Sequence, residues 1–243
     1  MRIVKVNATA STNSYLREFC RSMHIREDIL LWTDHQFAGR GQRGATWESA
    51  PFKNLTFSVF KRARLLPIDK QFYITMAASL AIFELLKELK VERLSVKWPN
   101  DILAGNRKLC GILIESVVKN NKLDAVIIGV GLNVNQILFE RAPKATSLKL
   151  ETEIDYELPE LIIKISQLFE KYVNRITKGD FEQIKADYES KLFKKDKPAL
   201  FSDPTGNRFN GMIKGVSHIG KLILQHEDDS HHDYGSKELK MLY

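Results

Sequence analysis

Four segments of the sequence combine glycines with cationic, amide and carboxylate side chains. They are GRGQRG at 39–44, KWPND at 97–101, KLCGIL at 108–113 and GVGLN at 129–133. Glycines let backbone N–H groups approach an anion closely, and arginine donates paired hydrogen bonds to phosphate or carboxylate. Together, the four segments predict a site for a nucleotide.

Residues 39–44 also match G-x-G-x-x-G, the fingerprint of dinucleotide-binding folds. That fingerprint requires a helix directly after its last glycine. Here Pro51 and the strand-like residues 55–60 follow instead. We therefore expect a cationic loop that carries Arg40 and Arg43 and wraps an anion, rather than a Rossmann fold.

Strands and helices in a mixed order must position these segments. Apolar patterning predicts strands at 2–6, 29–33, 55–60, 94–98, 111–118 and 124–130, the last two joined by a hairpin at 119–122. Helices are predicted after the cap residues 11–13, from Pro67 as the longest helical pattern, and at 158–176 and 181–192. This order predicts an α+β catalytic domain over residues 1–194, a mixed β-sheet packed with helices.

The pattern changes after Pro198 to short β runs separated by turn residues. The runs are 199–201, 209–216, 221–225 and 236–242. A segment of about 45 residues has the size of an SH3-like β-barrel rather than of a large independent domain. We therefore predict a small SH3-like C-terminal domain at 195–243.

Composition excludes several classes of protein. At 243 residues and 44% apolar content the chain can bury a substantial core. It has no apolar run near the roughly 20 residues that span a bilayer. Two cysteines, Cys20 and Cys110, are too few for a disulfide framework, so free thiols and a cytoplasmic location are expected. The net charge of +7 is spread thinly, which predicts a solvated basic surface rather than nucleic-acid binding, although it could also steer an acidic protein partner.

In these motifs and their order, the sequence resembles the biotin protein ligases. The resemblance covers nearly the whole chain and is carried by residues 11–13, 36–47, 97–101, 108–115, 129–133 and the C-terminal β runs. It implies a class II synthetase-like catalytic domain and the activity of a biotin-(acetyl-CoA-carboxylase) ligase. Biotin and MgATP would give biotinyl-5′-AMP and pyrophosphate, and a lysine of a biotin carboxyl carrier domain would then displace AMP.

The residue chemistry suits that reaction. The carboxylate of biotin is ionised at pH 7, so its attack on the α-phosphate needs no general base but requires two anions to be held together. Arg40 and Lys108 are the cations that we expect to be catalytic, because they can screen both anions. Asp101 is the expected ligand of Mg²⁺, which needs only one or two protein carboxylates. No side chain stands out as the base for the acceptor lysine.

The resemblance also implies ligand contacts. Those expected for biotin are Ser11, Thr12, Asn13, Gln36, Gly39, Arg40, Gly41, Gln42, Lys108, Gly111, Ile112 and Ile114. Those expected for the nucleotide are Arg43, Trp47, Asn100, Lys108 and Asn133, with Trp47 stacked on adenine. Gln42 stands where the family often has arginine and lacks its cationic fork. We therefore expect adenylate formation to survive and retention of biotinyl-AMP to be the property in question, with compensation by Arg43 as the alternative.

Each motif taken alone has a structural explanation. Residues 11–13 could be a helix cap, 100–101 a turn, Lys108 an exposed hairpin charge and Trp47 a core aromatic. Two other functions remain open: a lipoate or octanoyl ligase or transferase of the same architecture, and a non-catalytic biotin sensor. Arg40, Asp101 and Lys108 favour a ligase over a sensor.

The expected partner is the biotin carrier domain. No DNA partner is expected, since the sequence starts directly at the catalytic motifs without an upstream winged-helix segment. No membrane partner is expected either, and the ligase could be a monomer or a homodimer.

Overall fold

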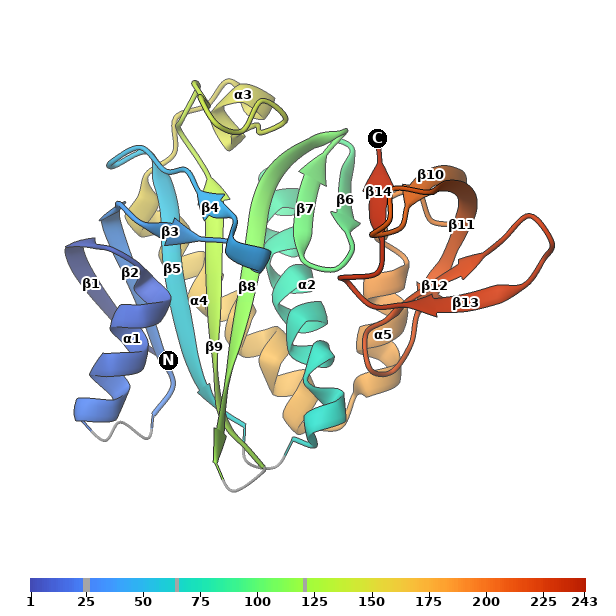
Figure 1. Ribbon diagram of the computed structural model, residues 1–243. Coiled ribbons are helices and arrows are strands. Elements are labelled where there is room, and N and C mark those ends of the chain that lie inside the picture. Colours follow the sequence, from blue (N-terminus) through green and yellow to red (C-terminus); the bar gives the residue numbers. More distant parts are fainter. Residues whose placement is uncertain (24–26, 64–65, 120–121) are drawn as a thin grey trace.

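The computed structural model describes residues 1–23, 27–63, 66–119 and 122–243 and has a seven-stranded sheet at its centre (Figure 1). In spatial order the strands are β1 (Arg2–Thr9), β2 (Ile29–Gln36), β5 (Asn54–Arg62), β9 (Lys122–Asn133), β8 (Arg107–Lys119), β7 (Asp101–Ala104) and β6 (Leu94–Lys97). The first pair is parallel and all other neighbours are antiparallel. The predicted mixed sheet is therefore confirmed.

Helices cover the two faces of this sheet unequally. On one face lie α2 (Phe72–Glu88), α4 (Leu158–Thr177) and α5 (Phe181–Glu189), and on the other lies α1 (Thr12–Ser22) (Figure 1). Strand β2 shows why both faces are apolar here. Leu30 and Trp32 belong to the core under α2 and α4, whereas Ile29 and Leu31 pack with α1, as the alternation of a strand requires. Since α1 is short, the sheet face on which it lies remains uncovered beside β9 and β8.

The C-terminal strands form a separate antiparallel sheet, consistent with the expected SH3-like module. Its order is β13 (His231–Tyr234), β12 (Leu222–Gln225), β11 (Arg208–Val216), β10 (Pro198–Ser202) and β14 (Lys240–Leu242). The predicted strand at 236–242 is too long, because residues 235–238 form a turn. Strand β13 has no apolar alternation and escaped prediction, since it is an edge strand held by backbone pairing to β12. The domain boundary at 194/195 stays a prediction.

Three further sequence predictions need correction. Residues 39–47 are not a plain loop, because β3 (Gly39–Arg40) and β4 (Thr46–Trp47) pair around a 3-10 turn, Gln42–Gly44. Strand β7 was not predicted. The longest helix is α4, with 20 residues against 17 in α2. No long helix follows the last glycine of 39–44, which confirms that this is not a Rossmann motif.

Other expectations agree with the structure. Lys119 pairs with Lys122 as the predicted hairpin requires, while its tip at 120–121 lies outside the described residues. Both cysteines are buried and free, and burial raises the pKa of the Cys20 thiol to about 11. Among the described residues, no helix is both long and apolar enough to cross a membrane.

The C-terminal sheet contacts the catalytic sheet through the turn between β11 and β12. Trp98 Nε1 donates a hydrogen bond of 3.0 Å to the carbonyl oxygen of Gly220. Gly220 has a positive φ of 85°, and a Cβ built there would lie 2.1 Å from the ring of Phe72 in α2. Both the backbone conformation and the close approach therefore require glycine.

We predict that Gly220→Ala lowers the free energy of unfolding by about 2–4 kcal/mol, from backbone strain and overpacking together. Gly206→Ala is the matched control, because Gly206 also has a positive φ of 93° but open space around it. It should cost only about 1 kcal/mol. Urea unfolding measures both losses, and equal losses would show that the contact with Phe72 is unimportant.

Candidate functional site

A cavity of about 290 Å³ lies on the sheet face that α1 leaves open. It brings together the four segments singled out in the sequence. The predicted residues that line it are Ser11, Thr12, Asn13, Gln36, Arg40, Gly41, Gln42, Trp47, Asn100, Asp101, Lys108, Gly111 and Ile112. The C-terminal module completes the wall with Leu239, Lys240 and Met241, a contribution that the sequence did not reveal.

Four of the predicted ligand-binding residues are not among the residues that line this cavity. Gly39 is buried behind it, against Gln36 and the backbone of Trp47. Ile114 lines an adjoining cavity. Asn133 is buried and its Nδ2 donates to Thr146 O at 2.8 Å, whereas its Oδ1 has no partner among the described residues. The side chain of Arg43 lies outside the described residues.

The floor of the cavity is made by glycines of β9 and β8. A Cβ built on Gly129 would lie 2.3 Å from Asn13 Oδ1, and one built on Gly131 would lie 2.3 Å from the ring of Trp47. Gly111 pairs with Gly131 across the two strands and also lies against Trp47. Because Gly129 and Gly131 have no side chains, Asn13 can pack on the first and Trp47 on the second, two residues further along β9.

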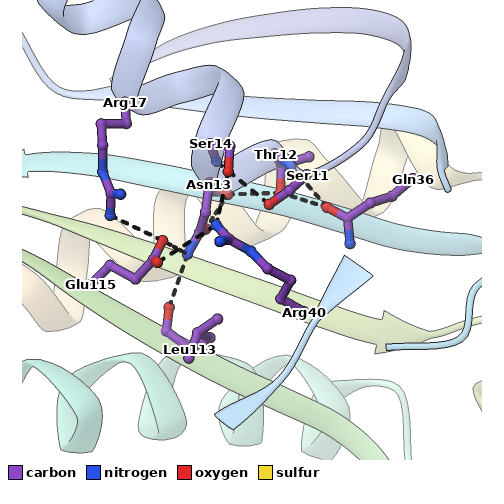
Figure 2. A network of polar contacts seen from close by, with 10 residues as sticks. Ser11, Thr12, Asn13, Ser14, Arg17, Gln36, Arg40, Leu113 and Glu115 are labelled. Atoms are coloured by element: carbon purple, nitrogen blue, oxygen red, sulfur yellow. Dashed lines mark hydrogen bonds and ion pairs between the residues drawn. The ribbon is translucent and has the colours of Figure 1, made fainter. Parts of the chain in front are cut away.

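A cluster of hydroxyl and amide groups occupies one part of the floor (Figure 2). Ser58 Oγ of β5 lies 2.8 Å from Thr12 Oγ1 and 2.6 Å from Asn13 Oδ1. Gln36 Oε1 accepts from the backbone N–H of Thr12 at 2.9 Å. Ser11 is the N-cap of α1, as the simple cap interpretation expects, and it also lines the cavity together with Thr12 and Asn13. Ser58 was missed, although a serine within an apolar strand was a visible signal.

The loop residue Arg40 extends toward this cluster. Its NH2 group donates to Ser14 Oγ at 2.8 Å and lies 3.6 Å from Glu115 Oε1. The same carboxylate accepts from Asn13 Nδ2 at 2.8 Å and forms an ion pair with Arg17 (Figure 2). Glu115 was not among the predicted site residues, because nothing in its strand connects it to the loop.

Cationic groups gather around a single carboxylate in the other part of the cavity. Lys108 Nζ lies 2.7 Å from Asp101 Oδ1 and 5.5 Å from the ring centroid of Trp47. Lys97 also lines the cavity, with its Nζ 4.7 Å from the ring centroid of Tyr243. Burial, reinforced by the charge of Lys108 and opposed by Asp101, holds the pKa of Lys97 below the ordinary lysine value. Such a site favours an anionic ligand.

The donor set suits Mg²⁺ rather than a transition metal. Within the part of the chain that the structure describes, no group of three His, Cys, Asp or Glu side chains could hold a metal ion. Asp101 offers one hard carboxylate at the cavity wall, and Mg²⁺ completes its shell with water and substrate phosphates. In addition, Trp47 Nε1 is buried without a partner among the described residues. It is therefore a donor available to a ligand.

We predict that Gly131→Ala displaces the ring of Trp47 and lowers the free energy of unfolding by about 1–3 kcal/mol. More of the tryptophan fluorescence should then be quenched by acrylamide. Gly211→Ala is the control, since Gly211 is also a buried strand glycine but a Cβ there would keep ordinary contacts of 3.5 Å. Wild-type quenching in Gly131→Ala would contradict the proposed packing of Trp47.

A second prediction concerns Lys97. A lowered folded-state pKa means that charged Lys97 destabilises the unliganded fold below that pKa, and that this cost disappears as pH rises through it. Lys97→Met should therefore be more stable than the wild type at pH 7, with the gain shrinking toward the ordinary lysine range. Urea unfolding across pH tests this. Lys144→Met is the control, because the exposed Lys144 lies over the same Tyr243 ring. A gain in the free energy of unfolding that does not change with pH would contradict a lowered pKa of Lys97.

The sequence is similar to those of known ligases. A model of the biotin/lipoate A/B protein ligase family matches residues 6–133. The chain is 30% identical over 224 residues to the biotin-(acetyl-CoA-carboxylase) ligase of Mycobacterium tuberculosis, with 90% of this chain and 81% of that ligase covered. It is 34% identical over 204 residues to the bifunctional ligase/repressor BirA of Bacillus subtilis, covering 82% of this chain and 62% of that relative.

The fold is similar to those of solved biotin protein ligases. The Aquifex aeolicus ligase in complex with biotin and ATP has a TM-score of 0.82 at 24% identity, with 99% of this chain and 98% of that chain covered. The Leishmania major ligase in complex with biotinyl-5-AMP has a TM-score of 0.66 at 21% identity, with 97% and 99% covered. These likenesses confirm the expected α+β architecture.

Proposed function

Because the chain belongs to the biotin/lipoate A/B protein ligase family, we propose that it is an ATP-dependent biotin protein ligase. One observation carries the proposal: a single cavity joins a hydroxyl and amide cluster to a cationic cluster across a glycine floor. The ureido ring of biotin needs hydrogen-bonding partners, and its carboxylate must meet a triphosphate. The two parts of the cavity match these two requirements.

In the first step, a carboxylate oxygen of biotin attacks the α-phosphorus of ATP, and the bond to pyrophosphate breaks. Thr12 and Asn13 bind the ureido ring, and Arg40 and Lys108 hold the two anions together. These cations stabilise the charge that develops on the transferring phosphoryl group. Asp101 would hold Mg²⁺, which neutralises phosphate charge when it is bound. Release of Lys108 from Asp101 accompanies ligand binding.

The nucleotide lies against Trp47, whose indole offers its ring face and the unpartnered Nε1 donor. Asn100 and Lys97 also line the cavity. Gln42 is exposed on the 3-10 turn of the loop and supplies no charge there. Weakened retention of the adenylate therefore remains our expectation for this chain.

In the second step, the amine of a carrier lysine attacks the carbonyl carbon of biotinyl-5′-AMP, and AMP leaves. The names of the relatives indicate the biotin carrier domain of acetyl-CoA carboxylase as the acceptor. We further propose that the protein is cytoplasmic, that it is a monomer or a homodimer, and that neither DNA nor a membrane is its partner.

The cavity disfavours lipoate as the acid. The dithiolane ring of lipoate offers no N–H or carbonyl group, so it could not hydrogen-bond to the polar side chains that line the cavity, such as Thr12 and Gln36. Unsatisfied buried polar groups of this kind each cost about 1–3 kcal/mol. A sensor without catalysis would not need the ion pair of Asp101 and Lys108 beside the floor.

Biotin-dependent ATP–pyrophosphate exchange tests the proposal. The wild type should exchange with biotin and not with lipoate, and Lys108→Ala should lose about 100-fold or more of the rate. Arg107→Ala is the control, because Arg107 is the cation next to Lys108 in the sequence but pairs with Glu151 and does not line the cavity. Absence of exchange with biotin in the wild type would refute the proposed function. Loss of exchange in both variants would contradict a specific catalytic role of Lys108.

A further inference from the structure

We infer that Glu115 is a positioning residue that fixes both Asn13 and Arg40 at the wall of the cavity. The inference rests on the proposed function and adds a residue to its binding site. Glu115 itself does not line the cavity, whereas Asn13 and Arg40 do. Its carboxylate, carried by β8, lies beside Asn13 and Arg40, with 23% of the side chain exposed (Figure 2). It therefore acts on a ligand only through these two residues.

The first effect is on the side-chain amide of Asn13, which is 4% exposed. A carboxylate only accepts hydrogen bonds, so Asn13 must turn its Nδ2 toward Glu115, at 2.8 Å, and its Oδ1 toward Ser58. With this orientation, the single hydroxyl proton of Ser58 is drawn to Asn13 Oδ1. The shorter bond to Glu115 thereby fixes which side of the Asn13 amide donates, supported by a longer contact of the same Nδ2 with the carbonyl oxygen of Leu113 at 3.5 Å.

The orientation extends to Thr12. Because the Ser58 proton is committed to Asn13, the proton of Thr12 has two acceptors in reach, Ser58 Oγ at 2.8 Å and Gln36 Oε1 at 3.1 Å. Gln36 Oε1 remains satisfied by the backbone N–H of Thr12. The oxygen of Thr12 keeps a lone pair as an acceptor, which matches a ureido N–H. A different orientation of Asn13 would present a different set of donors to the ligand.

The second effect is on Arg40. Its NH2 group is held by Ser14 Oγ at 2.8 Å and attracted by Glu115 Oε1 at 3.6 Å. These contacts use one of the three guanidinium nitrogens and leave donors for the anions in the cavity. Arg40 belongs to the β3–β4 hairpin, so Glu115 also links that hairpin to the strand beneath it. Loss of this link should let the adenylate escape faster.

Two substitutions separate the effects. Glu115→Gln keeps an oxygen that accepts from Asn13 Nδ2 but loses the charge that attracts Arg40. It should leave the biotin KM within about twofold of the wild type and speed release of biotinyl-5′-AMP about threefold, as expected for a half-exposed ion pair. Glu115→Ala loses both contacts, so its biotin KM should also rise about tenfold.

Arg17→Ala is the matched control, because Arg17 pairs with the same carboxylate at 3.2 Å but does not line the cavity. It should change neither the biotin KM nor adenylate release. Pyrophosphate exchange gives the KM values, and a chase of preformed adenylate with unlabelled biotin and ATP gives the release rate. Circular dichroism verifies folding, and Glu115→Gln keeps the test valid if the alanine variant does not fold.

The inference is wrong if both Glu115 variants behave like the wild type, if they raise the biotin KM equally, or if Arg17→Ala matches Glu115→Ala. A wild type that does not exchange with biotin would instead refute the proposed function. The two failures are therefore distinguishable.

Discussion

The site depends on a steric constraint in the middle of the sheet. Strand β9 has no side chain at Gly129 and Gly131, two successive positions on the face that α1 leaves open. Asn13 occupies the first space and the ring of Trp47 occupies the second. A Cβ at either position would push away the residue above it, so the hydrogen-bonding cluster and the nucleotide wall both depend on this bare strand. The helices on the opposite face hold the strand in place, because core residues of α2 and α4 are packed against Ile128, Val130 and Leu132 of β9.

Charge explains the other half of the architecture. Lys108 forms an ion pair with Asp101, the charge of Asp101 also acts on Lys97, and burial beside the C-terminal module disfavours the charged form of Lys97. Such an arrangement costs stability in the unliganded protein and strengthens attraction to phosphate in a site of low dielectric. The ring of Tyr243 and the residues around β14 form part of this environment. The small C-terminal sheet thus belongs to the site as well as to the fold.

Local signals made much of this predictable. The cap at Ser11, the apolar periods of the helices and most strands, and the four motifs all depend on neighbours in the sequence, so the sheet, the helices and most of the lining could be inferred. Contacts between distant residues could not. Ser58 and Glu115 are polar residues in apolar strands, and only the pairing of β5, β9 and β8 brings them to Asn13. Strand β13 and the hairpin at 39–47 were missed for a related reason, since backbone pairing rather than side-chain pattern holds them.

In the proposed mechanism, biotin and ATP meet over Gly129 and Gly131. A crystal structure of the protein with biotin and ATP tests it most directly, because the adenylate formed in the crystal would mark the position of each group. The ureido ring should lie beside Thr12 and Asn13, adenine against Trp47, and the phosphate between Arg40 and Lys108. Biotin or nucleotide bound elsewhere, or the two ligands bound in separate cavities, would contradict it.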